Sequence, residues 1–391
     1  MLSTVNIVQA YSQFLPNYGG IEKHIFFISR ELEKLGHRSS ILTTNLLNFR
    51  PSTLPKTSVV DGITVSRQCA ITARSITICP LALLKPKIPS KCDILHIHSL
   101  NPNSLFIPLA CHGFIKKLPV VVTPHFHPQR LQLESLKFKQ YFKQIAVRLL
   151  KKADCVIALT STEKQFYESK GFKNVYEIPN GVDLSCHEIC EEKLSSFEKA
   201  HDYEKKKILF VGRMVESKNL EGIIKSLPYI TKARSDILLY VVGSYTQHAS
   251  KLEALARRLG CRKYVRFFFN VADSDLPYYY EASDLVVLPS EYEAFGLVIL
   301  ESWAHKKPIV VSNRGGMEDI VSQGGGIVMN TLDPKKWASI ITNLVGDERR
   351  CKKLGLEGYE LVLEKYTWKK VAKKLVEAYS DTLARRCSKV N

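Results

Sequence analysis

The chain has 391 residues, of which 45% are hydrophobic and 24% are charged, so it is neither disordered nor fibrous and is long enough for two domains. Its formal net charge of +18 favours anionic partners, such as nucleic acid, anionic lipid headgroups or phosphorylated substrates. No apolar run reaches the roughly 18 residues of a membrane span, and no basic n-region precedes the first strand, so we expect a cytoplasmic protein.

The first half of the sequence alternates short apolar strands with helical patterns. Between the first two strands, residues 20–35 place apolar side chains at helical spacing, and Gly36 follows as a stop signal. The predicted strands are residues 5–10, 40–44, 63–67, 94–98, 120–124 and 155–159. This alternation predicts a parallel sheet covered by helices on both faces.

A second series of strands and helices begins at Ile208. Its predicted strands are residues 208–212, 237–243, 265–269, 284–289 and 308–312, and its predicted helices are residues 220–229, 249–259 and 295–305. We expect four segments: a first domain at 1–190, a charged linker at 191–207, a second domain at 208–366 and a C-terminal segment at 367–391. The fold class is therefore α/β, with two doubly wound Rossmann-like domains and a cleft between them.

The ten cysteines do not form a disulfide framework in this interpretation. Most of them stand singly in apolar surroundings, the one close pair is Cys186 and Cys190, and no CxxC motif occurs. Free thiols in a reducing compartment explain this pattern.

The strongest candidate for chemistry is the segment from Pro289 to Glu301, where a buried strand leads through a short loop into a helix. The backbone amides of the first helical turn lack partners and face the positive end of the helix dipole, which suits a diphosphate. We expect the amides of Phe295, Gly296 and Leu297 in this turn. Glu293 and Glu301 would be repelled by phosphate, so hydroxyl groups, as sugars carry, are their natural partners.

A second candidate lies where the first strand of the second domain ends, at Gly212. Arg213 and Lys218 follow in the turn that leads to the next helix. A guanidinium and an ammonium at this edge could neutralise a diphosphate leaving group, or they could be two solvated cations of a loop.

The pairing of these two segments resembles the retaining GT-B glycosyltransferases of family 4, relatives of sucrose synthase and bacterial phosphatidylinositol mannosyltransferases. The resemblance covers nearly the whole chain, because further matches occur in the same order. They are residues 19–24 (GGIEKH), 123–125 (TPH), 178–183 (IPNGVD) and 314–319 (RGGMED). It implies a GT-B fold, with the two domains facing each other, and a C-terminal helix that packs back on the first domain.

The resemblance also implies roles for individual residues. Arg213 and Lys218 would bind the donor diphosphate, Glu293 the hydroxyls of the donor sugar, and Glu301 those of the ribose. Other implied contacts are Gly19 and Gly20 beside the diphosphate, Gly212 in the donor site, His125 beside the donor sugar, and the amides of Phe295, Gly296 and Leu297 with phosphate and sugar. We count His125, Arg213, Lys218 and Glu293 as catalytic residues.

No cofactor or metal is expected. His96, His98, His112 and His127 lie near His125 in the sequence and raise the hypothesis of a metal site. However, only His96 and His98 share one face of a strand, and the other histidines lie on different elements. Asp273 and Asp275 spell a DxD, the metal–diphosphate motif of the other large glycosyltransferase fold, and we interpret them as a helix N-cap. The cationic side chains and the helix dipole make a divalent ion unnecessary.

Residues 134–152 are predicted to form one basic amphipathic helix. Its apolar stripe is Phe138, Phe142, Ile145 and Leu149, with six Lys and Arg residues around it. Such a helix can lie on an anionic membrane surface, or it can pack its stripe on its own sheet while its lysines are solvated.

The resulting expectation is an enzyme, a retaining hexosyltransferase (EC 2.4) that uses a nucleoside-diphosphate sugar and a lipid-linked or glycan acceptor. It would be cytoplasmic, with the option of peripheral attachment to the membrane, and no nucleic-acid partner is expected because no nucleic-acid-binding motif accompanies the charge. Two alternatives remain: a nucleotide-sugar epimerase of the same architecture, and a non-catalytic sugar-nucleotide-binding subunit.

Overall fold

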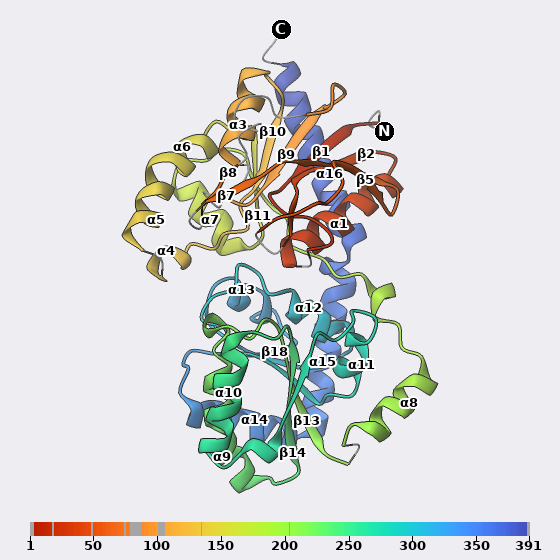
Figure 1. Cartoon of the computed structure of the whole chain (residues 1–391), viewed down its shortest axis with the longest axis vertical. Helices are drawn as coiled ribbons and strands as arrows, with labels where there is room; N and C mark the ends of the chain where they lie inside the picture. Colours follow the sequence, from red (N-terminus) through yellow and green to blue (C-terminus); the bar gives the residue numbers. More distant parts are fainter. Residues whose placement is uncertain are drawn as a thin grey trace. The chain divides into compact units, whose positions relative to one another are not determined.

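The computed structural model describes residues 4–17, 19–47, 50–73, 76–78, 88–100, 106–133, 135–202 and 204–388. The chain divides into two compact units (Figure 1). The first unit consists of Met1–Asn180 together with Trp368–Asn391, and the second unit consists of Gly181–Thr367. Each unit is built on its own largely parallel sheet, so the predicted α/β fold is confirmed.

The first unit contains an eight-stranded sheet in the order β12-β11-β10-β9-β1-β2-β6-β5. Neighbouring strands are parallel except β5 and β6, which form an antiparallel pair at one edge. The strands are β1 (Asn6–Ala10), β2 (Arg38–Thr44), β5 (Thr57–Val60), β6 (Ile63–Gln68), β9 (Ile94–His98), β10 (Val120–Thr123), β11 (Cys155–Ala158) and β12 (Val175–Glu177). Two short antiparallel pairs accompany them, β3 (Leu46–Leu47) with β4 (Arg50–Pro51) and β7 (Ile71–Ala73) with β8 (Ile76–Ile78).

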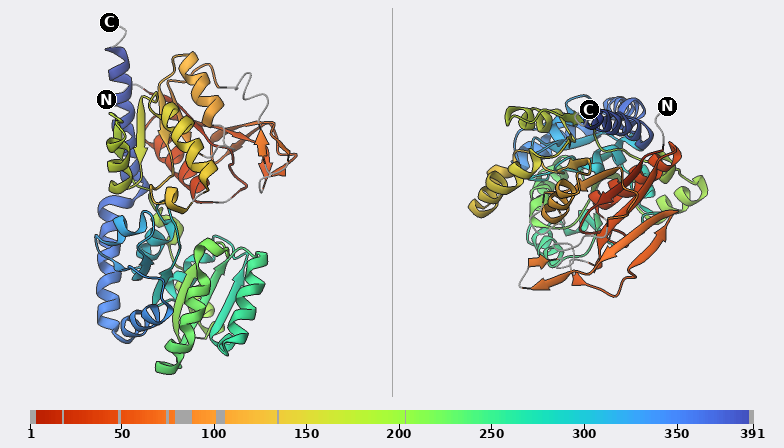
Figure 2. Two further views of the ribbon diagram at one scale, coloured as in Figure 1. Left: turned by 90° about the vertical axis from the view of Figure 1, so that its left-hand side faces the viewer. Right: turned by 90° about the horizontal axis from the view of Figure 1, so that it is seen from above.

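Helices cover both faces of this sheet (Figure 2). They are α1 (Gly20–Lys34), α3 (Phe106–Ile115), α4 (Arg130–Leu133), α5 (Leu136–Tyr141), a π-helix (Phe142–Ala146), α6 (Val147–Leu150), α7 (Ser161–Ser169) and α16 (Trp368–Cys387). On one face, Leu109 of α3, Leu150 of α6 and Tyr167 of α7 are buried in one apolar cluster. The other face is covered by α1 and α16.

The last helix, α16, is an integral part of the first unit although it is far away in the sequence. Trp368, Leu375 and Tyr379 on α16 are buried in one cluster with Ile7 of β1 and Ile28 of α1. Helix α16 thus packs on the first unit.

The second unit contains a six-stranded parallel sheet in the order β15-β14-β13-β16-β17-β18. Its strands are β13 (Lys206–Val211), β14 (Ile237–Gly243), β15 (Val265–Phe269), β16 (Leu285–Leu288), β17 (Ile309–Ser312) and β18 (Gly326–Met329). Its α-helices are α8 (Glu191–Ala200), α9 (Leu220–Ala233), α10 (Gln247–Arg258), α11 (Leu276–Glu281), α12 (Leu297–Ala304), α13 (Met317–Val321), α14 (Pro334–Gly346) and α15 (Glu348–Leu361). Short helical turns lie at Leu184–His187, Glu216–Lys218, Arg262–Tyr264 and Val362–Tyr366.

The segment predicted as a linker, residues 191–207, is ordered secondary structure instead. It forms α8 and the beginning of β13, and the division between the units falls after Asn180. Phe197 of α8 packs edge-on against Tyr279, with ring centroids 4.8 Å apart, and this contact anchors the charged helix. Lys206 and Lys207 can form the beginning of the strand because Asp284 binds both of them. Its carboxylate accepts hydrogen bonds from Lys206 Nζ at 2.9 Å and from the Lys207 amide at 2.8 Å.

The basic segment at 134–152 is not one regular helix with the predicted stripe. It comprises α5, the π-helix and α6, and the π-helical turn shifts the register of the face that points to the core. Ala146 and Leu150 are buried, whereas Ile145 of the predicted stripe is 43% exposed. The side chains of Phe138 and Phe142 lie outside the described residues.

Each sheet has a point where the strand order reverses, between β1 and β9 in the first unit and between β13 and β16 in the second. Ligands of doubly wound sheets bind beyond the carboxyl ends of the strands at such points. Within the described residues, no helix is long and apolar enough to cross a membrane.

Candidate active site

In the second unit, the predicted donor residues follow the two strands that flank the reversal point. Gly212 and Arg213 come directly after β13, and Glu293 lies in the loop after β16. The backbone at Gly212 contacts the end of β14 so closely that a Cβ on Gly243 would lie 1.9 Å from the Gly212 carbonyl oxygen. Glycine at position 243 therefore keeps the turn after β13 in place.

The two motifs meet in an ion pair between Lys218 and Glu293, which are 75 residues apart in the sequence. Both side chains are 18% exposed, so the pair can still meet a ligand. The Ser290 hydroxyl donates a second hydrogen bond to the same Glu293 oxygen at 3.1 Å. The sequence placed both residues in the donor site, but this direct pairing was not foreseen, and neither was the part of Ser290.

The backbone of Glu293 is held by the turn after β17. The Gly316 amide donates to the Glu293 carbonyl oxygen at 2.9 Å, and Glu293 and Gly315 form an isolated parallel bridge. Gly315 has φ +74°, and a Cβ there would lie 1.8 Å from the Glu293 carbonyl oxygen. Only glycine fits at this position, which gives the RGG segment at 314–316 a physical role in orienting Glu293.

The helix that follows, α12, begins later than predicted. Gly296 is its N-cap residue with φ +92°, and Leu297 is its first helical residue. Phe295 precedes the cap and is 3% exposed, so its amide is not part of the first helical turn. The reason is the left-handed conformation of Gly296, which interrupts the helix at that residue.

Glu301 lies on α12 and is engaged by a tyrosine. The hydroxyl of Tyr280 donates to a Glu301 oxygen at 2.8 Å. Burial, and then the negative charge of Glu301, raise the pKa of Tyr280 well above its ordinary value, so the phenol stays protonated and acts as the donor. Arg213, in contrast, is exposed and makes no ion pair within the described part of the chain.

In the first unit, Gly19 and Gly20 lie at the start of α1. Gly19 is the N-cap residue in an extended conformation, and its carbonyl oxygen accepts the Lys23 amide at 2.9 Å. A Cβ on Gly19 would lie 2.6 Å from the carboxylate end of Glu22, a flexible side chain. Gly20 is exposed at the first helical residue.

His125 follows β10 and belongs to a cluster of imidazoles. It adopts φ +48°, uncommon for a residue with a side chain. Its ring lies over that of His98, with centroids 5.3 Å apart, and His125 Nε2 is 3.1 Å from His98 Nδ1. The ring of His24 is edge-on to His125 at 5.0 Å. Burial, and then the neighbouring histidines, hold the pKa of His125 well below its ordinary value, so the imidazole is neutral at pH 7.

His24, His98 and His125 each offer a nitrogen within 4.8 Å of the others, a donor set that could hold a metal ion such as Zn²⁺. The structure thus selects a different set from the sequence, which grouped His125 with His96, His98, His112 and His127. His24 was missed although it stands in the GGIEKH segment, one helical turn after Gly20. Its Nδ1 donates to Asn180 Oδ1 at 2.7 Å, and burial lowers the pKa of His24 to about 4.

The DxD residues Asp273 and Asp275 are both exposed. Asp275 occupies the N-cap position of α11, as predicted, but its side chain makes no capping hydrogen bond. The N-cap interpretation therefore holds for its position in the chain and is wrong for the hydrogen bond.

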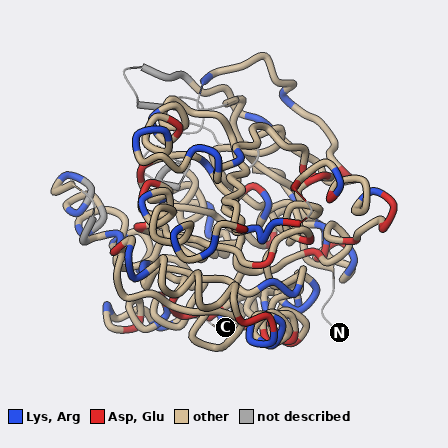
Figure 3. Tube along the Cα trace, turned by 90° about the horizontal axis from the view of Figure 1, so that it is seen from below, with Lys and Arg blue, Asp and Glu red and all other residues tan. Residues whose placement is uncertain are grey.

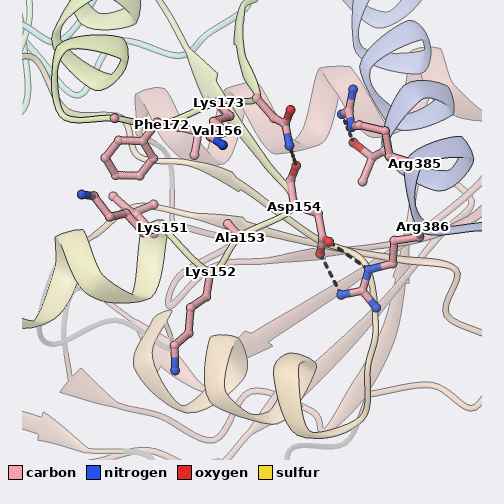
Figure 4. A pocket seen from close by; sticks show the side chains of 13 residues that line it. Lys151, Lys152, Ala153, Asp154, Val156, Phe172, Lys173, Arg385 and Arg386 are labelled. Atoms are coloured by element: carbon pink, nitrogen blue, oxygen red, sulfur yellow. Dashed lines mark hydrogen bonds and ion pairs between the residues drawn. The ribbon is translucent and has the colours of Figure 1, made fainter. Parts of the chain in front are cut away.

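A basic pocket of about 350 Å³ lies in the first unit, on the amino-terminal side of β11 (Figure 4). Asp154 accepts two hydrogen bonds from the Arg386 guanidinium at 2.9 Å, while Lys151 and Lys152 point away from this pair. Over the whole chain, Lys and Arg are spread along much of the trace with fewer acidic positions among them (Figure 3). The pocket continues the basic character of the segment at 134–152.

Two doubly wound sheets, with candidate groups for an anion and a sugar beyond their carboxyl edges, define a transferase of the GT-B class. Comparison with known families agrees: residues 18–185 match Glycosyltransferase Family 4, and residues 191–361 match Glycosyl transferases group 1. Together these two matches cover most of the chain, which belongs to the GT4-type glycosyltransferases. The predicted family and enzyme class are thereby confirmed.

Individual relatives match over the same length. An uncharacterized glycosyltransferase of Methanocaldococcus jannaschii is 26% identical over 385 residues, which are 92% of this chain and 94% of the relative. A D-inositol 3-phosphate glycosyltransferase of Thermobispora bispora is 25% identical over 94% of this chain and 91% of its own.

Solved structures show the same fold. Sucrose-phosphate synthase from Thermosynechococcus elongatus superposes with a TM-score of 0.76 at 20% identity, over 97% of this chain and all of that chain. HepE of Anabaena in complex with UDP gives a TM-score of 0.79 at 19% identity, again over 97% of this chain and all of that one. The predicted GT-B fold is confirmed.

Proposed function

We propose that this glycosyltransferase moves a hexosyl group from a nucleoside-diphosphate sugar to an acceptor hydroxyl and keeps the anomeric configuration. The observation that carries this proposal is the meeting of Lys218 and Glu293 beyond the reversal point of the second sheet. The Lys218 ammonium suits a phosphate, and the Glu293 carboxylate suits the hydroxyls of a sugar. A nucleotide sugar carries phosphate and sugar hydroxyls next to each other.

The donor would be held by groups of complementary charge. Arg213, Lys218 and the amides at the start of α12 would bind the diphosphate, because all of them offer N–H donors with positive charge or dipole. Glu293 would accept hydrogen bonds from sugar hydroxyls and Glu301 from the ribose. Complexes of HepE with UDP and with UDP-glucose support a nucleotide-sugar donor.

Retention follows from the groups available for proton transfer. Glu293 is engaged by Lys218 and Ser290 and is assigned to the donor sugar, so it is not a free general base for inversion. The bond from the anomeric carbon to the diphosphate oxygen breaks, and the acceptor oxygen bonds to the same face of that carbon. The acceptor proton passes to the departing diphosphate oxygen, whose charge Arg213 and Lys218 stabilise. No metal ion or cofactor is required in this scheme.

The acceptor is proposed to be a lipid-linked or glycan hydroxyl at the cytoplasmic membrane face, to which the protein attaches peripherally. In the segment at 134–152, Leu136 is 83% exposed and Ile145 is 43% exposed. Lys137, Lys143 and Arg148 of the same segment are exposed as well. Exposed apolar side chains among cations are the composition of a surface that binds anionic lipid.

The test begins with a panel of UDP-, GDP- and ADP-sugars, scored by thermal stabilisation, because a bound donor raises the unfolding temperature. The stabilising donor is then incubated with candidate acceptors, and the product is examined by NMR. An α-linked product from an α-donor supports the proposal, and a β-linked product contradicts retention. Free sugar formed without an acceptor would indicate the epimerase alternative, and binding without turnover the non-catalytic subunit.

A further inference from the structure

A line of buried hydrogen bonds connects α16 to His125 within the first unit. It runs from Tyr379 through Gln9 of β1 and His98 of β9. Gln9 Nε2 lies 3.4 Å from the Tyr379 hydroxyl, Gln9 Oε1 lies 2.7 Å from His98 Nε2, and His98 Nδ1 lies 3.1 Å from His125 Nε2. Tyr379, Gln9 and His98 are at most 2% exposed, so solvent does not supply alternative partners.

The donor and acceptor of each bond can be assigned, beginning with Tyr379. Burial raises the pKa of Tyr379 far above its ordinary value, so the phenol keeps its proton. The Gln9 amide nitrogen donates to the phenol oxygen and cannot accept in return. The phenol proton therefore goes to His96 Nδ1 at 2.7 Å, and neutral His96 donates from Nε2 to Thr123 Oγ1 at 2.7 Å.

The side-chain oxygen of Gln9 determines the tautomer of His125, through His98. Gln9 Oε1 can only accept, so the proton of neutral His98 is on Nε2 and its Nδ1 is a bare acceptor. His125 Nε2 must then carry a proton and donate to His98 Nδ1. Since His125 is neutral, its Nδ1 is left as an acceptor, and it makes no hydrogen bond within the described part of the chain.

We propose that Gln9 and Tyr379 are positioning residues, which hold His125 in its neutral Nε2-protonated form and so present Nδ1 as an acceptor for a hydroxyl of the donor sugar. Neither residue touches the substrate; both act through His98. This inference rests on the proposed function, because the sugar hydroxyl is the group that His125 would meet. It explains why a helix from the end of the chain carries a buried tyrosine hydroxyl into a polar cluster.

The test combines NMR and kinetics on the full chain. Long-range ¹H–¹⁵N spectra of protein labelled with ¹⁵N-histidine distinguish the two neutral tautomers, and His125→Gln assigns the His125 signal. We expect Nε2–H for His125 at pH 7.5. Gln9→Leu removes the acceptor for His98, so His125 should shift toward the Nδ1–H form, and kcat/KM for the donor should fall about tenfold, the scale of one hydrogen bond.

Gln9→Glu is the matched rescue, because an acid oxygen still accepts from His98 whether or not the acid is ionised. It should restore both the His125 tautomer and kcat/KM relative to Gln9→Leu. Tyr379→Phe, which keeps the shape of the side chain, frees the Gln9 amide to turn over and should give a mixture of His125 tautomers. Tyr240→Phe, which removes another buried hydroxyl whose partner is the His201 carbonyl oxygen, should leave the His125 signal unchanged.

Either of two NMR results would overturn the tautomer assignment: Nδ1–H as the His125 tautomer in the wild type, or an unchanged tautomer in both Gln9→Leu and Tyr379→Phe. The NMR measurement of the His125 tautomer does not require turnover, so a failure of this inference can be distinguished from a failure of the proposed function. Should the wild type transfer no sugar at all, the proposed function fails while the tautomer assignment is still measured. If His125→Gln turns over like the wild type, the sugar contact of His125 is wrong.

Discussion

The candidate groups of the second unit are charged, whereas those of the first unit are neutral. Lys218 and Glu293 form an ion pair with 18% of each side chain exposed. His24, His98 and His125 are packed ring against ring, and burial lowers the pKa of each. In the proposed function the two units would therefore contribute differently: the cations of the second unit, such as Lys218, suit a diphosphate leaving group, and the neutral imidazoles of the first unit can only exchange hydrogen bonds with uncharged groups such as sugar hydroxyls.

The largest effect should come from removing positive charge in the second unit. Arg213→Ala and Lys218→Ala should each cost about 3–4 kcal/mol of transition-state stabilisation, a loss of about 10²- to 10³-fold in kcat. His125→Ala should cost less, because a neutral hydrogen bond is weaker than a charged one. Steady-state kinetics measure all three, with Lys225→Ala on the exposed face of α9 as the control. Near-normal turnover in both cation variants would remove them from the mechanism.

A second prediction concerns the backbone that supports Glu293. Gly315→Ala should destabilise the protein by about 2–4 kcal/mol, since a positive φ and a steric clash add together. Gly36→Ala is the matched control, because Gly36 also has a positive φ (+86°) but nothing lies within 4 Å of its added Cβ. Denaturant unfolding should show a clearly larger loss for Gly315→Ala. Equal losses would mean that the contact with Glu293 does not constrain the turn.

The neutral cluster should make stability depend on pH. The pKa of His24 is lowered from 6.5 to about 4 in the folded protein. Between these two pH values His24 therefore binds a proton in the unfolded chain but not in the folded chain. Stability is therefore intact above pH 6.5 and falls as the pH is lowered toward 4, by on the order of 2 kcal/mol at pH 5 for His24. Urea unfolding between pH 7.5 and pH 5 measures how steeply the free energy of unfolding changes with pH, and His24→Asn should make this dependence weaker. A slope that is the same in the variant would show that His24 is not the group responsible.

Another prediction concerns membrane binding, to which the first unit contributes its basic segment at 134–152. The protein should pellet with anionic vesicles at low salt and be released as the salt concentration rises. Substituting Glu for Lys139, Lys143 and Lys151 together should weaken binding by at least about 1 kcal/mol per position. A far-ultraviolet CD spectrum like that of the wild type serves as the folding control. A wild type that ignores anionic vesicles at every salt concentration would favour a soluble acceptor.

No change in activity is expected on removal of metal ions. If cationic side chains stabilise the leaving group, turnover should survive exhaustive EDTA treatment. Loss of activity that Mg²⁺ or Mn²⁺ restores would revive Asp273 and Asp275 as metal ligands. Restoration by Zn²⁺ alone would instead point to the nitrogens of His24, His98 and His125.

The parts of the fold that were predictable are those with a strong local pattern. Helix α1 and strands β9, β13 and β14 follow from apolar periodicity that the chain carries within each segment. Helix α8 was not predictable in this way, because its packing depends on Tyr279, far away in the sequence. Nor was the charged beginning of β13, which Asp284 makes possible.

The candidate site shows the same division between local and distant information. Arg213, Lys218, Glu293 and Glu301 stand in segments whose order and spacing resemble a known family, so the sequence alone was enough to propose a role for each. His24 comes near His98 and His125 only because α1, β9 and β10 lie next to one another in the fold, and a linear spacing does not reveal that. The partners of Glu301 and Glu293, Tyr280 and Ser290, likewise emerge only from packing.

Helix α16 has a consequence for how the protein is made. The apolar cluster around Ile7 and Ile28 includes Trp368, Leu375 and Tyr379, which the ribosome adds after the whole second unit. The second unit is contiguous from Gly181 to Thr367 and can complete its core while the first unit still lacks a helix. The order of completion is therefore opposite to the order of the sequence: the unit that begins the chain can complete its core only after the second unit has been synthesised.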